Sequence, residues 1–128
     1  MSSELVLLVE DNELNLELAR DVLQLRGLRT LEARTAGEGI ALACTCRPDL
    51  VLLDIQLPDM DGVAALRALR TMPETADVPI VALTAFAMRP DRARLLEAGF
   101  DGYVSKPLDV RTFPDEVIAY CTRARQGH

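Results

Sequence analysis

A chain of 128 residues is long enough to bury one hydrophobic core and too short for two domains of ordinary size. Its hydrophobic fraction of 49% excludes a disordered tail as the main content, and no apolar run reaches the ~20 residues that cross a bilayer. The net charge of −6, without any basic cluster, argues against direct binding to nucleic acid.

Three local features of the sequence bear on where the protein is found in the cell and on which metals it could bind. Three cysteines, an odd number, are atypical of a disulfide framework and favour a reducing compartment. The N-terminus, Met1 to Glu4, lacks the basic residues with which a secretory signal begins. The only histidine is the terminal His128, which argues against a zinc site. We therefore expect a cytoplasmic protein that does not enter the membrane.

The first half of the chain predicts two strands, each followed by a helix. An uninterrupted apolar run at 5–9 is typical of a strand buried on both faces of a parallel sheet. A helix follows it and is expected to end at Gly27. The apolar stripe of this helix consists of Leu14, Leu18, Val22 and Leu25. A weaker strand at 29–33 precedes a second helix, whose apolar residues are Ile40, Ala41 and Ala43.

The second half of the chain continues the same alternation. Apolar runs at 50–53 and 78–83 predict two more buried strands, separated by a helix that begins near Asp61. The remaining elements are a fourth helix, a weaker strand and a fifth helix, expected at 90–98, 102–105 and 110–123. Pro114 must then lie in the first turn of the fifth helix. Five strand–helix units in strict alternation predict a doubly wound α/β sheet with right-handed crossovers.

Polar side chains stand where the predicted strands end, namely Glu10, Asp11, Asp54, Thr84 and Lys106. In a parallel sheet all carboxyl ends lie along one edge, where open α/β sheets bind their ligands. These side chains are therefore expected to converge. Three carboxylates in a small space repel one another unless a cation neutralises them, and their oxygens suit Mg²⁺.

The same residues fit metal-assisted phosphoryl transfer, which needs mainly positioning and charge neutralisation. Asp54 is best placed as a carboxylate nucleophile because it ends a buried strand, while Thr84 and Lys106 would bind phosphoryl oxygens. Taken singly, each residue also fits an ordinary role. Asp11 or Asn12 would cap a helix, Asp54 would be a turn residue, Lys106 would belong to a loop, and Thr84 would be a buried β-branched residue. Their joint placement at four strand ends favours a metal and phosphoryl site over these separate ordinary roles.

Four stretches together resemble the receiver domains of response regulators in two-component signalling. They are LVLLVEDNELN at 5–15, PDLVLLDIQLPDMDG at 48–62, PIVALTAFA at 79–87 and GYVSKP at 102–107. Within that family the chain is most similar to single-domain cell-division regulators of the DivK type. The resemblance covers essentially the whole chain and implies one receiver domain over 1–128. It also implies a flavodoxin-like fold, a five-stranded parallel sheet of order 2-1-3-4-5 with five helices.

The resemblance implies a site for Mg²⁺ or Mn²⁺. Glu10 and Asp11 would hold the ion directly or through water, and Asp54 would be both a ligand and the phosphorylated residue. The backbone carbonyl of Gln56 would be a further ligand. Many receivers have Asp in place of Glu10, and the longer side chain favours a water-bridged contact.

The resemblance also implies a phosphoryl-binding group and a switch. Thr84 and Lys106 would bind the phosphoryl group, helped by the backbone N–H of Ala85, and the Lys106–Pro107 peptide would be cis. Tyr103 matches the switch aromatic, which turns inward when Thr84 moves toward the phosphate. The alternative for Tyr103 is a half-buried strand tyrosine with a fixed rotamer.

The implied function is a signalling switch. A histidine kinase or histidine phosphotransfer protein would donate a phosphoryl group to Asp54, and a shift of the fourth helix, fifth strand and fifth helix would alter affinity for a downstream protein. The chain would not be an enzyme beyond Mg²⁺-dependent self-phosphorylation and autodephosphorylation. The family docks its first helix against paired kinase helices. Opposite the apolar stripe, Leu16 is expected to face solvent and, with Asn15, to be a candidate partner contact.

The same residues allow three other interpretations. The chain would also fit a receiver domain excised from a hybrid histidine kinase. A dehalogenase-like phosphatase would place a second Asp two residues after its nucleophile, where this chain has Gln56. A flavodoxin-like flavin carrier would need a phosphate-cradling loop after the first strand, but residues 10–13 are anionic there and lack glycine.

The lifetime of the phosphorylated state is a further expectation. Gln56 and Phe86, each two residues after a site residue, would flank the approach of water to the phosphorus. The bulky ring of Phe86 excludes water and offers it no hydrogen bond, which predicts a lifetime of many minutes or longer.

Overall fold

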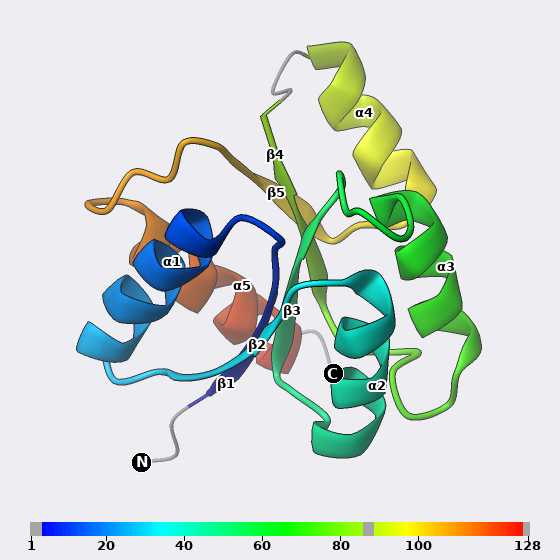
Figure 1. Cartoon of the computed structure of the whole chain (residues 1–128), viewed down its shortest axis with the longest axis horizontal. Coiled ribbons are helices and arrows are strands. Elements are labelled where there is room, and N and C mark those ends of the chain that lie inside the picture. The colour runs from blue at the N-terminus through cyan, green and yellow to red at the C-terminus, as the bar shows by residue number, and fades with distance from the viewer. Residues whose placement is uncertain (1–3, 86–88, 127–128) are drawn as a thin grey trace.

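A five-stranded parallel sheet forms the centre of the computed structural model, which describes residues 4–85 and 89–126 (Figure 1). The strands are β1 (Leu5–Val9), β2 (Arg29–Ala33), β3 (Leu50–Asp54), β4 (Ile80–Thr84) and β5 (Gly102–Ser105). Their order across the sheet is β2-β1-β3-β4-β5, and every neighbouring pair is parallel. The predicted doubly wound fold and its strand order are confirmed.

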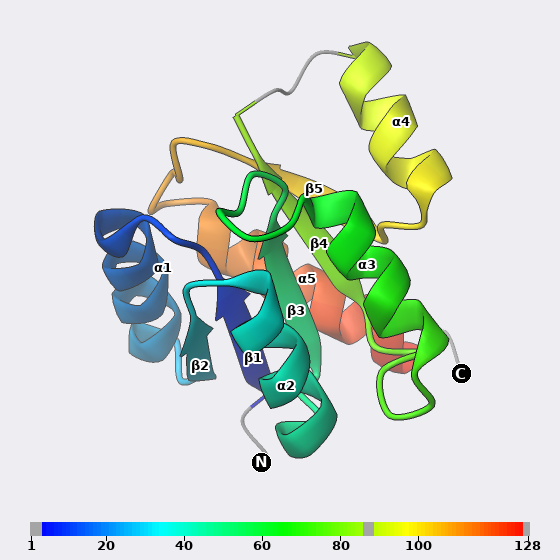
Figure 2. The same ribbon diagram turned by 45° about the vertical axis from the view of Figure 1, so that its right-hand side comes forward.

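Helices cover both faces of this sheet. They are α1 (Glu13–Leu25), α2 (Ala36–Cys46), α3 (Gly62–Thr71), α4 (Arg89–Ala98) and α5 (Phe113–Gln126). The helices α1 and α5 pack on one face, and α2, α3 and α4 pack on the other (Figure 2). Within residues 4–85 and 89–126, no helix combines the length and apolar character needed to span a membrane.

The continuous apolar strands are explained by the two cores. Successive residues of a strand point to opposite faces of the sheet, so a strand covered on both sides must be apolar at every position. In β1, Val6 and Leu8 belong to the core under α1 and α5, whereas Leu7 and Val9 belong to the core on the other face. All of these side chains are at most 1% exposed.

Three predicted boundaries differ from the structure by two residues or more, and one of them is the end of the fifth helix, which lies at Gln126 rather than at 123. The fourth strand begins at Ile80 rather than at 78, since Pro79 has no N–H to donate to a ladder. The fifth helix begins at Phe113 rather than at 110, because a turn closed by the Asp109 carbonyl comes first. That carbonyl accepts from the N–H groups of Thr112 and Phe113, at 3.1 and 2.8 Å. Pro114 lies in the first turn, as predicted.

Local signals set several helix ends as expected. The Asp61 side chain caps α3 by accepting from the Ala64 N–H at 2.9 Å. Gly27, with φ of 85°, follows the end of α1 in the left-handed region. The Asn12 side chain caps α1 by accepting from the Asn15 N–H at 3.0 Å. Asn12 therefore performs the capping role that the sequence left open between Asn12 and Asp11.

The sequence prediction of the buried face of α1 was largely wrong, although Val22 of the predicted stripe is partly buried against the core under α1 and α5. Leu14 and Leu25, expected on the buried stripe, are 76% and 86% exposed, while Leu16 is only 3% exposed. The buried residues of α1 are Leu16, Ala19 and Leu23. Both sets repeat at helical spacing and lie on nearly opposite sides of the helix. The predicted stripe contains more large apolar residues than the buried one, but the position of the helix on the sheet decides which stripe is covered.

Candidate metal and phosphoryl-acceptor site

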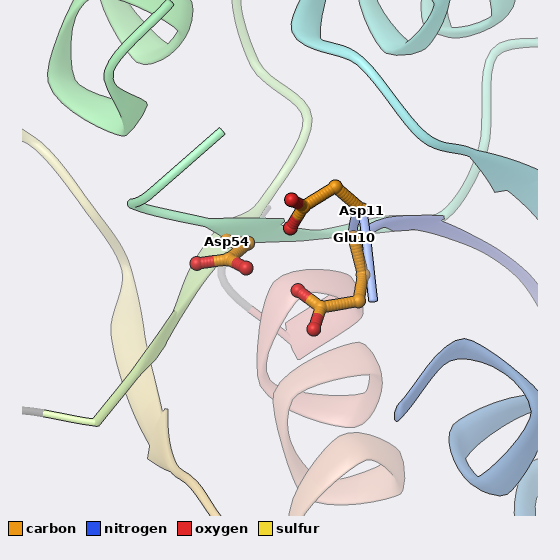
Figure 3. A group of neighbouring side chains, drawn as sticks. All are labelled: Glu10, Asp11 and Asp54. Atoms are coloured by element: carbon orange, nitrogen blue, oxygen red, sulfur yellow. The ribbon is translucent and has the colours of Figure 1, made fainter. Parts of the chain in front are cut away.

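Three carboxylates meet at the carboxyl edge of the sheet. Glu10 and Asp11 follow β1, and Asp54 is the last residue of the neighbouring strand β3. Their side chains gather at these two strand ends (Figure 3), with one ligand oxygen of each within 4.8 Å of the others. The convergence that the sequence predicted is therefore present.

These carboxylates differ in exposure. Glu10 and Asp54 are each 2% exposed, whereas Asp11 is open to solvent. Lys106 extends from the end of β5 between the two buried acids, with Nζ at 2.7 Å from Asp54 Oδ2 and at 3.2 Å from Glu10 Oε2. When all four groups are ionised, the three carboxylates exceed the one ammonium by two negative charges. The edge therefore keeps an excess of negative charge.

The titration behaviour of the site reflects this crowding. Burial, together with the hydrogen bond and charge of the adjacent Asp54, raises the pKa of Glu10 to about 7, against the opposing effects of Asn15 and Lys106. For Lys106, burial acts to lower the pKa, but the hydrogen bond and charge of Asp54, together with Glu10, outweigh burial and raise it. A divalent cation would relieve the repulsion that disfavours an ionised Glu10.

The donor set fits a hard divalent cation. All three side chains offer carboxylate oxygens, and the exposed Asp11 leaves one side open to water, as Mg²⁺ requires. Gln56 stands beside this set, since its backbone N–H donates to Asp54 Oδ1 at 2.9 Å. The further role expected for the Gln56 carbonyl, as a metal ligand, stays a prediction.

The residues expected to bind the phosphoryl group lie at the same edge. Thr84 ends β4, the neighbour of β3, and is buried. The Lys106 N–H donates to the Thr84 carbonyl at 2.8 Å, which ties the end of β5 to the end of β4. The Lys106–Pro107 peptide is cis, as the resemblance implied. Ala85 follows Thr84 and is exposed.

The remaining predicted residues have different outcomes. Tyr103 is half-buried in β5 and packs against the core under α2, α3 and α4, which leaves open both readings of it. Leu16 is buried, so the prediction that it faces solvent as a partner contact was wrong. The water-shielding role of Phe86 falls outside the described residues.

Asn15 has a contact that sequence reasoning missed. Its side-chain Nδ2 donates to Glu10 Oε1 at 2.8 Å, so Asn15 holds the carboxylate of a candidate metal ligand. A signal for this contact existed in the sequence. Side chains of a helix lean toward its N-terminus, and an amide in the first turn of α1 therefore reaches back toward the end of β1.

A response regulator receiver domain has this strand order, an acidic carboxyl edge and a lysine followed by a cis peptide bond. The model of that family matches residues 6–118. The chain belongs to this family. It is 41% identical over 115 residues to the polar-differentiation response regulator DivK of Brucella anthropi, an alignment covering 90% of this chain and 94% of that protein. The predicted resemblance to DivK-type regulators is thereby confirmed.

Solved structures agree with this assignment. A CheY-like receiver domain protein from Methanospirillum hungatei is 27% identical, with a TM-score of 0.88 over 99% of this chain and all of that one. The receiver domain of a sensor histidine kinase from Pseudomonas aeruginosa, with a magnesium ion coordinated in its active-site cleft, is 31% identical. Its TM-score is 0.85 over 94% of this chain and 99% of that one.

Proposed function

We propose that this chain is a signalling switch in which Asp54 accepts a phosphoryl group from a phosphohistidine of a histidine kinase or a histidine phosphotransfer protein. The observation that carries the proposal is the environment of Asp54. It is buried at the end of β3, ion-paired to Lys106 at 2.7 Å, and clustered with Glu10 and Asp11. This combination supports a carboxylate nucleophile with charge compensation at hand.

The transfer replaces one bond to phosphorus with another. A carboxylate oxygen of Asp54 bonds to phosphorus while the bond from phosphorus to the donor histidine nitrogen breaks. The electron pair of the broken bond stays on that nitrogen, which takes up a proton. Lys106 Nζ is already within hydrogen-bond distance of Asp54, and after transfer it would bind an oxygen of the phosphoryl group. Thr84 and the Ala85 N–H would bind the other phosphoryl oxygens.

The metal would be held by Glu10, Asp11, Asp54 and the Gln56 carbonyl. A bound Mg²⁺ or Mn²⁺ supplies neutralising charge to the phosphoryl oxygens. The magnesium in the P. aeruginosa neighbour supports this assignment. Gln56 stands where a phosphatase would need a second aspartate, so we expect slow loss of phosphate by autodephosphorylation instead of turnover on other substrates.

The donor is proposed to dock on α1. In place of Leu16, the exposed apolar side chains of this helix are Leu14, Leu18 and Leu25. Asn15, in the first turn of the same helix, is half-buried and donates to Glu10, and it stays a candidate contact. Output would pass from Thr84 and Tyr103 to a protein partner at α4, β5 and α5. A cytoplasmic location is part of the proposal, and the three free cysteines are consistent with it.

Labelling with a radioactive phosphodonor tests the assignment of Asp54. Wild type should take up label from acetyl phosphate and from a phosphorylated histidine kinase in the presence of Mg²⁺, and Asp54→Asn should take up none. Asp101→Asn is a matched control, because Asp101 pairs with Arg70 and bonds the start of β4. Label on Asp54→Asn at the wild-type level would contradict the proposal. If Asp54 is labelled in wild type, phosphotransfer from many different kinases should be compared. The kinases that donate to the chain would help to distinguish a free regulator from the receiver domain of a hybrid kinase.

A further inference from the structure

The β3–α3 loop, residues 55–61, bonds to a helix far away in the sequence. In this loop, Asp59 Oδ1 accepts from the Ala36 N–H at 2.8 Å and Oδ2 accepts from the Gly37 N–H at 3.0 Å. Ala36 and Gly37 are the first two residues of α2. One carboxylate therefore spans the N-terminus of α2, where the helix dipole favours negative charge. Both bonds lower the pKa of Asp59.

Helix α2 also has a cap of its own. The Thr35 side chain accepts from the Glu38 N–H at 3.1 Å, and the Thr35 carbonyl accepts from the Gly39 N–H at 3.0 Å. The first four N–H groups of α2 are thus divided equally between Thr35 and Asp59. Because Thr35 holds the helix end locally, the pair of bonds to Asp59 acts mainly on the loop.

The same loop begins at the proposed phosphoryl acceptor. The Gln56 N–H donates to Asp54 Oδ1 at 2.9 Å, so Gln56 helps to orient the carboxylate. The ends of the loop are drawn together by the Gly62 N–H, which donates to the Ile55 carbonyl at 3.0 Å, and by a bridge between Gln56 and Asp61. Movement of the loop would therefore move both the Gln56 carbonyl and the Asp54 carboxylate.

We propose that Asp59 is a positioning residue for the metal and phosphoryl site. It holds the tip of the β3–α3 loop against α2 and so keeps Gln56 and Asp54 in the arrangement that binds the cation. Asp59 is not one of the three acids that gather at the site, and it acts through the loop backbone. The inference rests on the proposed function, since it assigns Gln56 and Asp54 to a metal site.

The test compares two substitutions of the same kind. Asp59→Asn keeps the size of the side chain, but it puts an amide donor where one oxygen accepted from Gly37. Asp49→Asn is the matched control. Asp49 is also exposed, and its Oδ2 accepts from the Leu5 N–H at 2.7 Å where β1 begins, at the opposite edge of the sheet. Both variants lose one charge, but Asp49→Asn keeps an oxygen that can accept from Leu5, whereas Asp59→Asn must lose one of its two backbone hydrogen bonds.

Magnesium binding is measured by titration calorimetry, and the loop is followed by amide NMR signals without metal. Asp59→Asn should weaken Mg²⁺ binding about 3- to 10-fold. This is less than the ~10–100-fold loss of metal affinity that is typical when a residue hydrogen-bonded to a metal-binding side chain is replaced. The Gln56 amide signal should shift in this variant. Asp49→Asn should bind Mg²⁺ within about twofold of wild type and leave that signal in place, and Asp59→Glu, which retains both oxygens, should recover most of the lost affinity.

Two negative results have different meanings. If wild type binds Mg²⁺ and is labelled on Asp54, yet Asp59→Asn binds as tightly as Asp49→Asn, the positioning role is overturned and the proposed function stands. If wild type neither binds Mg²⁺ nor takes label on Asp54, the proposed function fails, and the inference about Asp59 fails with it. Urea denaturation of each variant establishes that binding is compared between folded proteins.

Discussion

Two leucines on α1 distinguish the buried face of the helix from its exposed face. Leu16 is 3% exposed and belongs to the core under α1 and α5, whereas Leu14 is 76% exposed. Replacing a buried leucine with alanine removes apolar contacts and leaves a cavity, at a cost of ~2–5 kcal/mol. Leu16→Ala should therefore destabilise the protein by ~3 kcal/mol, and Leu14→Ala should change its stability by less than ~0.5 kcal/mol.

Urea denaturation followed by circular dichroism measures this difference. With a slope of ~1.5 kcal/mol per molar urea, a loss of ~3 kcal/mol lowers the unfolding midpoint by ~2 M. The Leu14→Ala midpoint should stay within ~0.3 M of wild type. The same two variants test donor docking. Leu14→Ala should slow transfer from a phosphorylated kinase and leave labelling by acetyl phosphate intact, because its substitution changes only the exposed face.

Equal midpoints for the two variants would refute the assignment of the buried face. A large loss of stability in Leu14→Ala alone would restore the stripe that the sequence predicted. Leu16→Asp, which would have slowed transfer selectively had Leu16 faced solvent, is now expected to unfold the protein and to abolish labelling by either donor.

Three further outcomes are expected. Asp11→Asn should abolish or strongly weaken the single Mg²⁺ site, measured by calorimetry, and wild-type affinity in this variant would leave Asp11 outside the site. The pKa of Glu10 in the folded protein is about 7, above its usual 4.5, so the metal-free protein should lose stability as pH rises from 4.5 through 7. Its Mg²⁺ affinity should rise over the upper part of that range, because Glu10 becomes ionised there. Glu10→Gln should flatten both trends, and parallel profiles for the two proteins would contradict this. Gly62→Ala should lower stability by ~1–3 kcal/mol in thermal unfolding, because its Cβ would lie 2.5 Å from the Ile55 Cα. Gly37→Ala, whose Cβ would meet its nearest neighbour at 3.5 Å, is the near-neutral control.

Several features of this protein were decided by the amino-acid sequence alone. Uninterrupted apolar runs such as 50–53 predicted strands covered on both faces, since each side of such a strand must be apolar. Asp61 and Gly27 marked helix ends through local hydrogen bonding and backbone conformation. The clustering of Asp11 with Asp54 followed from topology, because parallel strands bring their carboxyl ends to one edge whatever their separation in the chain.

Only the tertiary structure decided which stripe of α1 is buried. Spacing along a helix shows that Leu14 and Leu18 share a side, and that Leu16 lies opposite, but the side that meets the sheet depends on how the chain leaves β1. The bonds from Asp59 to the start of α2 had no local signal for the same reason. Such contacts join segments more than twenty residues apart, and they exist only once β1, β2 and β3 have paired and fixed the position of α2.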